Sequence, residues 1–262
     1  MDLQLQNKVV LITGGSKGIG LACARGFLAE GARVAIASRN PAHLHAAVAL
    51  LRDEGHHVLP VVVDLCDADQ AQQMADTVTT QLGAVQVLVT SAGAARRTPY
   101  AELTAAHWQA AMQAKYFTTI NALQSVLPHM AARGEGAVVN IIGIGGKLAS
   151  AIHLPGGAAN AALMLATAGL GNAHAGRGVR VNAVNPGLTD TERLQEGLAA
   201  EARLRGSTPE AVRAELLAKL PSGRFARPDE VADVVVFLAS ARASHVNGAI
   251  LSLDGGATPM VV

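Results

Sequence analysis

The sequence lacks most features of secreted, metal-binding and nucleic-acid-binding proteins. Its 262 residues include only two cysteines, Cys23 and Cys66, and no cysteine–histidine pairs at the spacing of zinc ligands. We therefore expect two reduced thiols in a cytoplasmic protein, and no metal site. The formal net charge is +1 and no run of like charges occurs, which argues against nucleic acid or a membrane surface as a partner.

Aromatic residues are also scarce, with four phenylalanines, two tyrosines and one tryptophan. The core must therefore consist mainly of Ala, Val, Leu and Ile, which belong to the 50% of residues that are hydrophobic. No apolar run reaches the ~18 residues of a membrane span, and the N-terminus does not resemble a signal peptide. A chain of this length can form one large α/β domain.

Short apolar segments alternate with longer segments of helical character. Strands that are apolar on both faces belong in a sheet covered on both sides, and regular alternation with helices predicts right-handed crossovers and a parallel sheet. The strands are predicted at Lys8–Thr13, Arg33–Ala37, Val58–Val63, Val85–Val89, Ala137–Ile142, Val179–Val184 and Ala249–Leu253. The helices are predicted at Gly18–Glu30, Pro41–Glu54, 68–82, 104–133, 156–175 and 229–240, and residues 190–222 form a charged helical insertion.

A glycine-rich stretch, TGGSKGIG at residues 13–20, follows the first strand and begins the first helix. Gly14, Gly18 and Gly20 allow a tight turn, close approach of the backbone to a pyrophosphate, and close packing of helix on strand. The helix N-terminus adds free N–H groups and the positive end of a dipole. This placement indicates a dinucleotide-binding loop rather than a glycine-rich turn without a ligand.

The end of the second strand predicts which dinucleotide binds. An NAD-dependent enzyme usually has Asp or Glu here, whereas this chain has Ala37, Ser38 and Arg39. The Arg39 guanidinium can donate two parallel hydrogen bonds to a 2′-phosphate, and Lys17 can add charge at the same group. We therefore expect NADP(H) to be preferred over NAD(H); the alternative is that Arg39 is merely solvated.

In this order the motifs resemble the short-chain dehydrogenase/reductase family over the whole chain. TGGSKGIG is similar to its TGxxxGxG cofactor loop, VVVDLCD (61–67) to its adenine-contacting segment, and LVTSAG (88–93) to its LVNNAG element. RVNAVNPGLTDT (180–191) resembles its RVNxxxPGxxxT stretch, and RPDEVADVVVFLAS and GAILSLDGG resemble its C-terminal part.

The resemblance implies one Rossmann-type α/β domain over residues 1–262, doubly wound, with about seven parallel strands and helices on both faces. It implies a substrate lid at about residues 189–222, and a small carbonyl or alcohol compound as substrate. It also implies cofactor contacts from Gly14, Ser16, Lys17, Gly18, Ile19, Gly20, Ser38, Arg39, Asp64, Leu65, Ser91, Ala92, Gly93, Asn160, Pro186, Gly187 and Thr189.

The family's four catalytic residues are not found at the positions that the resemblance implies. Members use Asn, Ser, Tyr and Lys to bind the substrate oxygen and to supply its proton, because hydride transfer to a carbonyl leaves an alkoxide. The matching positions in this chain hold Lys115, Gly143, Gly156 and Asn160.

No shift of register recovers the family's Tyr-x-x-x-Lys pair. Four residues after Tyr100 stands Thr104, and four residues after Tyr116 stands Ile120. Tyr116 lies about 100° round the helix from the neighbouring asparagine position, so it should face elsewhere.

Three residues are candidates to replace the missing groups. His153 has a suitable ordinary pKa of ~6.5, but Pro155 places it just outside the next helix, where it is either a proton carrier or a loop residue without a role. Lys115 either stabilises developing negative charge or reaches the nicotinamide ribose; alternatively it extends to solvent or pairs with an acid. Asn160 can still form hydrogen bonds with the ribose hydroxyls.

Two hypotheses follow for the function. The first, which we favour, is an NADP(H)-dependent oxidoreductase with an atypical active site; the second is an inactive NADP(H)-binding protein that serves as a sensor or structural partner. Gly143, Gly145 and Gly146 form either an anion-binding nest or a flexible loop. The Ala- and Gly-rich helix of residues 156–171 resembles the family's subunit-contact surface, so we expect a homodimer or homotetramer.

Overall fold

Seven parallel strands form one sheet in the order β3-β2-β1-β4-β5-β6-β7. The computed structural model describes residues 1–93 and 95–259. The strands are β1 (Val9–Thr13), β2 (Arg33–Ser38), β3 (Val58–Val62), β4 (Val87–Thr90), β5 (Gly136–Ile141), β6 (Val179–Pro186) and β7 (Ile250–Leu253). The predicted doubly wound Rossmann-type fold is confirmed, and each predicted strand lies within two residues of an observed one.

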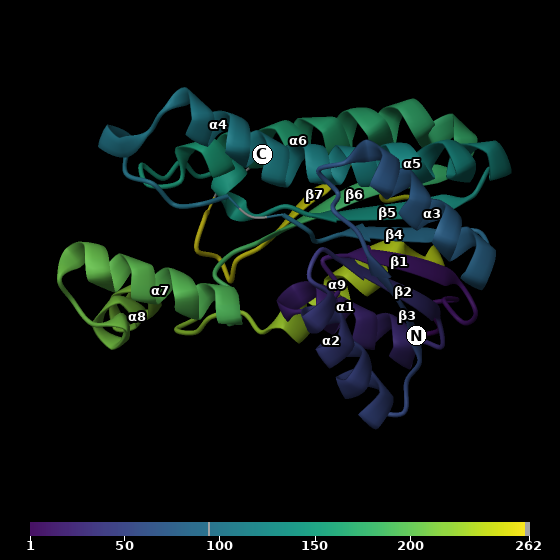
Figure 1. Ribbon diagram of the computed structural model, residues 1–262, viewed down its shortest axis with the longest axis horizontal. Coiled ribbons are helices and arrows are strands. Elements are labelled where there is room, and N and C mark those ends of the chain that lie inside the picture. Colours follow the sequence, from purple (N-terminus) through teal and green to yellow (C-terminus); the bar gives the residue numbers. More distant parts are fainter. Residues whose placement is uncertain (94, 260–262) are drawn as a thin grey trace.

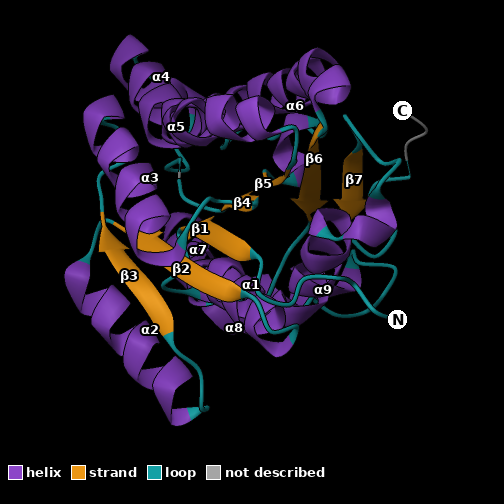
Figure 2. Cartoon of the chain, turned by 90° about the vertical axis from the view of Figure 1, so that its right-hand side faces the viewer, coloured by secondary structure: helices purple, strands orange, loops and turns teal. Residues whose placement is uncertain are grey.

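Helices cover both faces of this sheet (Figure 1, Figure 2). The helices α1 (Gly18–Ala29), α2 (Pro41–Asp53) and α9 (Pro228–Ala239) pack on one face, where Phe27, Leu44 and Val235 are buried. The helices α3 (Ala68–Leu82), α5 (Thr118–Arg133) and α6 (Leu154–His174) pack on the other, around Met74, Leu123 and Met130. Short 3₁₀ turns lie at Tyr100–Glu102 (η1), Ile144–Gly146 (η3), Ala175–Arg177 (η4) and Ala241–Ala243 (η5).

The sequence predicted one continuous helix over residues 104–133, which was wrong because a π-helical turn interrupts it. The segment begins as α4 (Ala105–Ala111), widens into a π-helical turn, η2 (Met112–Phe117), and continues as α5. Single π-helical turns inserted in helices are frequent at functional sites. The turn includes Lys115, one of the candidate residues.

Buried polar side chains fix the position of α6 against the sheet. Thr90 Oγ1 donates to Asn140 Oδ1 at 2.7 Å, and Asn140 Nδ2 donates to Thr167 Oγ1 at 2.9 Å. Thr167 in turn donates to the Leu163 carbonyl at 2.7 Å. Because each of these polar groups has a partner, the network holds the helix in one register relative to β4 and β5.

Beyond the carboxyl ends of the strands, α7 (Glu192–Arg205) and α8 (Pro209–Ala218) extend away from the sheet (Figure 1). They enclose a small apolar core of their own, made by Leu198, Ala202 and Val212. We refer to residues 189–222 as the lid segment. Its position agrees with the helical insertion that the sequence predicted.

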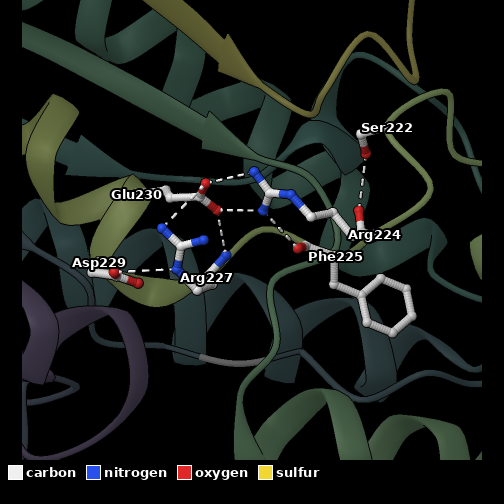
Figure 3. Close-up of polar contacts among 6 residues, drawn as sticks. All are labelled: Ser222, Arg224, Phe225, Arg227, Asp229 and Glu230. Atoms are coloured by element: carbon white, nitrogen blue, oxygen red, sulfur yellow. Dashed lines mark hydrogen bonds and ion pairs between the residues drawn. The ribbon is translucent and has the colours of Figure 1, made fainter.

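An ion-pair cluster connects the chain just after the lid segment to α9 (Figure 3). Arg224 donates from both terminal nitrogens to Glu230, at 2.6 and 2.8 Å, and the Arg227 backbone N–H donates to the same carboxylate at 2.8 Å. The Arg224 guanidinium, followed by the backbone bond from Arg227, lowers the Glu230 pKa to about 2. The cluster therefore remains charged at physiological pH and fixes where the chain returns to the sheet.

Both cysteines are free, and Cys23 lies in the core. Among the described residues, none of the helices is both long and apolar enough to cross a membrane. In the same part of the chain, no group of three or more His, Cys, Asp and Glu side chains is arranged to hold a metal ion.

Candidate active site

A cleft of about 1150 Å³ opens at the carboxyl ends of the strands. Its walls come from the glycine-rich loop, from the segments that follow β4, β5 and β6, and from α7. In doubly wound sheets this edge is where ligands bind, at the point where strand order reverses, here between β1 and β4. Among the predicted site residues, those that line it are Gly14, Lys17, Gly18, Ile19, Ser91, Gly93, Lys115, Gly143, His153, Pro186, Gly187 and Thr189.

The glycine-rich loop is packed so closely that side chains are excluded from it. A Cβ on Gly20 would overlap the Gly14 carbonyl oxygen, and a Cβ on Gly14 would lie 2.8 Å from the Ser91–Ala92 peptide. The Lys17 side chain does not cap α1, so the first N–H groups of this helix have no side-chain acceptor. The loop thus presents backbone donors and a helix N-terminus to the cleft, which suits a phosphate group.

The residues that were predicted to bind the 2′-phosphate of the cofactor lie at the ends of β1 and β2. Ser16 Oγ donates to Ser38 Oγ at 3.1 Å, and Arg39 follows on the exposed side. Lys17, however, forms an ion pair with Glu192 at 2.8 Å. The Lys17 ammonium group therefore connects the glycine-rich loop to the first turn of α7, a position that the sequence did not predict.

The remaining predicted cofactor residues are at the ends of β3, β4 and β6. Asp64 Oδ1 accepts from the Cys66 backbone N–H at 3.0 Å, and the Leu65 carbonyl accepts from Asn121 at 2.8 Å, so this segment has a fixed conformation. The Ser91 backbone N–H donates to the Thr13 carbonyl at 3.0 Å, which joins the end of β4 to the end of β1.

Lys115 points from η2 into the cleft and does not extend to solvent. Its Nζ donates to the Ile142 carbonyl at 3.0 Å, next to Gly143. Burial, and then the positive charge of Arg193, lower the Lys115 pKa to about 8. Among the described residues no carboxylate lies within 4 Å of this ammonium group, so the alternative of pairing with an acid is wrong.

His153 stands at the N-cap position, just before α6, as the position of Pro155 predicted, and its side chain makes no capping hydrogen bond. A Cβ placed on Gly156 would overlap the Cε1 and Nε2 atoms of this ring and would lie 2.8 Å from the Ala95 Cβ. The imidazole therefore occupies the space into which a side chain at position 156 would extend. Its Nδ1 is buried and has no hydrogen-bond partner in the described part of the chain.

The pKa of His153 is lowered to about 4, mainly by burial of the ring. The positive charges of Arg97, Lys115 and Arg193 lower it further. The imidazole is consequently neutral at physiological pH in the ligand-free protein, and it can donate one hydrogen bond and accept another.

Gly143 lines the cleft and Asn160 lies behind it, since a Cβ on Gly143 would be 3.5 Å from Asn160 Nδ2. Asn160 is 4% exposed, and its Oδ1 is buried without a partner among the described residues. Gly143 has a φ of +125° and a ψ of +145°, a conformation that is open essentially only to glycine, and its N–H donates to Asn185 Oδ1 at 3.3 Å. Serine could not replace Gly143 without a change of the backbone.

Close packing on α6 explains Gly146 of the β5–α6 loop, because a Cβ there would lie 2.8 Å from the Ala161 backbone nitrogen. A Cβ on Gly145 would lie 3.4 Å from Asn160 and 3.5 Å from His153, which are ordinary contact distances, so packing does not require glycine at that position. Tyr116 packs instead around Ile142 and Leu163 and does not line the cleft, as its helical position predicted.

Comparison with known proteins identifies the family. A family profile described as Enoyl-(Acyl carrier protein) reductase matches residues 14–258. The cis-4-hydroxycyclohexanecarboxylate dehydrogenase of Sinomonas cyclohexanicum is 38% identical over 252 residues, which are 96% of this chain and 96% of that protein. The chain belongs to the short-chain dehydrogenase/reductase family.

Two further relatives extend over nearly the same length as this short-chain dehydrogenase/reductase. The D-threitol dehydrogenase of Mycolicibacterium smegmatis is 36% identical over 259 residues, 98% of this chain and 95% of that protein. The crystal structure of L-sorbose reductase from Gluconobacter frateurii, complexed with NADPH and L-sorbose, matches with a TM-score of 0.92 at 30% identity and covers 100% of both chains.

Two arginines of the cleft in this family member were not predicted from the sequence. Arg193, on α7, donates from Nη1 to the Gly93 carbonyl at 3.1 Å, and Arg97 lies on the segment that follows β4. The only signal in the sequence that could have indicated them was their location, Arg193 within the predicted lid and Arg97 just after LVTSAG. That signal was weak, because surface arginines are common in such segments.

Proposed function

We propose that the protein is an NADP(H)-dependent oxidoreductase that interconverts a carbonyl compound and an alcohol with a rebuilt proton-transfer site. Its family membership and its dehydrogenase and reductase relatives support the reaction class. The observation that carries the proposal of an atypical site is the position of the His153 ring over Gly156. A tyrosine cannot occupy position 156 while the His153 ring is there. The glycine at position 156 is therefore what allows the ring to lie in this place.

The cleft residues fit a dinucleotide. The glycine-rich loop and the N-terminus of α1 offer donors to a pyrophosphate. The unpartnered Oδ1 of Asn160 is a buried acceptor that a ribose hydroxyl would satisfy, and a buried polar atom without such a partner is costly. We propose that Ser16, Ser38 and Arg39 hold the 2′-phosphate of NADP(H), since the structural relative above was solved with NADPH.

Replacing Arg39 with aspartate should reverse the cofactor preference. The change removes a bidentate donor to the 2′-phosphate and supplies an acceptor for the 2′-hydroxyl of NAD(H), so the NADPH/NADH affinity ratio should fall by about 10²–10³-fold. Fluorescence titration with both cofactors measures this ratio, with Arg52→Met, an exposed arginine on α2, as the control. Tighter binding of NADH by the unaltered protein would show that NADP(H) is not the preferred cofactor.

In the proposed reaction Lys115 is the proton carrier and His153 positions the substrate oxygen. When bound, NADPH would supply the hydride to the carbonyl carbon. The oxygen then takes a proton from the Lys115 ammonium group, which is held beside Gly143 and has a pKa near working pH. Neutral His153 donates a hydrogen bond to the same oxygen from the space that tyrosine occupies elsewhere in the family.

The alternative is an NADP(H)-binding protein without turnover, which is favoured by the change of all four family catalytic positions. Stopped-flow measurement of NADPH oxidation in a single turnover, against a panel of aldehydes and ketones, separates the two functions. We expect oxidation with at least one carbonyl class. Tight NADPH binding without oxidation by any of them supports the alternative.

We also propose that the protein forms a homodimer or homotetramer through the outer faces of α5 and α6. Leu165 on α6 is 78% exposed, and Phe117, just before α5, is 43% exposed. Exposed apolar side chains of this size often mark contact surfaces. Light scattering at micromolar concentration should give a mass of two or four times 26.8 kDa, whereas Leu165→Glu should give the monomer. A monomeric mass for the unaltered protein would contradict this proposal.

A further inference from the structure

Positive charge is concentrated around His153, beyond what the proposed proton transfer needs. Three cations, Arg97, Lys115 and Arg193, lower the pKa of this imidazole, and Arg97 and Arg193 neither give nor take the proton in that transfer. Arg96 lines the same cleft. The four cationic groups come from three separate segments: η2, the stretch after β4, and α7.

The arginines after β4 are held against the His153 loop by specific contacts. The Ala95 Cβ lies 2.8 Å from the position of a Cβ on Gly156, and the Thr98 N–H donates to the Ile152 carbonyl at 2.9 Å. Arg96 and Arg97 stand between these two contacts. They are therefore fixed at the same end of the cleft as the proposed proton-transfer residues.

Arg193 is on α7 and reaches the segment that follows β4. Its Nη1 donates to the Gly93 carbonyl at 3.1 Å, which uses one of its five N–H donors. Burial, and then the charge of Arg97, lower the Arg193 pKa, while the charge of Glu196 raises it. Arg97 and Arg193 both line the cleft, so two like charges lie near each other there. The arrangement costs electrostatic free energy unless an anion lies between them.

The acidic residues of the cleft neutralise this group only in part. Glu192 is paired with Lys17 at 2.8 Å, and Glu201 is shared between Arg97, at 3.5 Å, and Arg205. Glu102 and Glu196 also line the cleft. Within the described ranges, neither Arg96 nor Arg193 has a carboxylate within the 4.0 Å of an ion pair.

We infer that the substrate is an oxo- or hydroxycarboxylic acid, whose carboxylate is held by Arg97 and Arg193 while its carbonyl or alcohol oxygen lies beside His153 and Lys115. Guanidinium groups match a carboxylate in geometry and bind it with charge-assisted hydrogen bonds. Arg96 is at the entrance, where it attracts the anion. This inference rests on the proposed function and specifies its substrate class.

Matched substrates test the inference. A series of oxocarboxylates of increasing chain length is compared with the methyl esters of the same compounds, so that only the charge differs and the reacting carbonyl is the same. We expect kcat/KM for the best acid to exceed that of its ester by about 10–100-fold, the size expected for charge-assisted hydrogen bonds. Arg193→Met and Arg97→Met should each lower this acid/ester ratio about tenfold or more. The ratio is taken within one variant, so any effect of the lost charge on Lys115 and His153 is common to the acid and the ester.

Two control variants sharpen the result. Glu201→Gln removes the carboxylate that competes for Arg97, so the acid/ester ratio should stay the same or rise. Arg52→Met, on exposed α2, should change nothing. Equal rates for acids and esters overturn the inference. So does an Arg193→Met variant that weakens NADPH binding without changing the ratio, because its guanidinium then serves the cofactor phosphates.

If no carbonyl compound is reduced, the proposed function fails and the anion site is tested separately. Calorimetric titration of the NADPH-loaded protein with hexanoate and with hexanamide then reports binding without turnover. Binding of hexanoate alone, lost in Arg193→Met, supports an anion site. Equal binding of both compounds, or of neither, overturns it.

Discussion

Lys115→Met should lower kcat for carbonyl reduction by about 10²–10⁴-fold, the usual contribution of a positioned proton donor. The ammonium group is held by the Ile142 carbonyl next to the substrate-oxygen position, and its lowered pKa of about 8 makes it a better proton donor than an ordinary lysine. Methionine has a similar length and keeps most of the apolar contacts of the side chain. The loss should therefore reflect the missing proton and charge rather than a cavity.

The pH profile distinguishes a proton donor from a packing residue. Reduction needs the protonated lysine, so kcat of the unaltered protein should fall as pH rises through about 8, and this limb should be missing in Lys115→Met. The folded pKa lies below that of an unfolded lysine, so between these values the unfolded chain binds more protons. The unfolding free energy of the unaltered protein, relative to the variant, should consequently rise from about pH 8 to about pH 10.5.

Lys147→Met is the matched control, because Lys147 is a lysine of the β5–α6 loop whose side chain has, among the described residues, one hydrogen bond, to Ser252 Oγ at 3.5 Å. It should keep both the rate and the pH profile. Stopped-flow NADPH oxidation and chemical unfolding over pH 6–11 provide the two readouts. An unchanged rate and an unchanged pH limb in Lys115→Met would show that the proton comes from another group.

The fold could be predicted from local patterns because its determinants are local. The strand Val9–Thr13 is buried on both faces, and a continuous apolar run identifies such a strand directly. Asn40 followed by Pro41, and Asp67 before Ala68, are recognisable helix starts, and both side chains accept hydrogen bonds from the first turn. The π-helical turn at Met112–Phe117 has no such signature, so it was missed.

The candidate site could be located, but its geometry could not be predicted. The sequence identified which residues stand at positions 143, 153, 156 and 160. It did not predict that the His153 ring would occupy the space next to Gly156. That relation depends on how the loop after β5 packs against α6. The Lys17–Glu192 ion pair and the Arg193–Gly93 hydrogen bond span about 175 and 100 residues of sequence, and they depend in the same way on where the lid segment lies.

Gly156→Ala should lower activity by about 10²-fold or more, although it adds only one methyl group. The new Cβ would overlap Cε1 and Nε2 of His153, so the ring must turn away from the substrate-oxygen position. Misplacing a catalytic group by about 1 Å can cost this much. The atoms that the methyl group meets first belong to the end of a side chain rather than to the backbone, so the fold should remain intact and thermal unfolding should change little.

Gly169→Ala is the matched control on the same helix. A Cβ there meets no atom within 4 Å, so the variant gains the helix propensity of alanine, about 1 kcal/mol, without moving His153. It should keep full activity and equal or better stability, with the oligomeric state checked by light scattering. Equal loss of activity in Gly156→Ala and Gly169→Ala would mean that α6 is sensitive to any substitution and that the histidine is not involved.

A double-mutant cycle assigns the effect to the ring itself. His153→Ala should lower kcat by about 10²–10⁴-fold, because it removes the hydrogen bond to the substrate oxygen. Once the imidazole is absent, the methyl group at position 156 has nothing to displace except the Ala95 methyl group, 2.8 Å away. The double variant His153→Ala/Gly156→Ala should therefore be no slower than His153→Ala alone, and the two losses should be strongly non-additive. Losses that multiply would show that Gly156 acts independently of His153, and the proposed replacement of tyrosine by histidine would then be wrong.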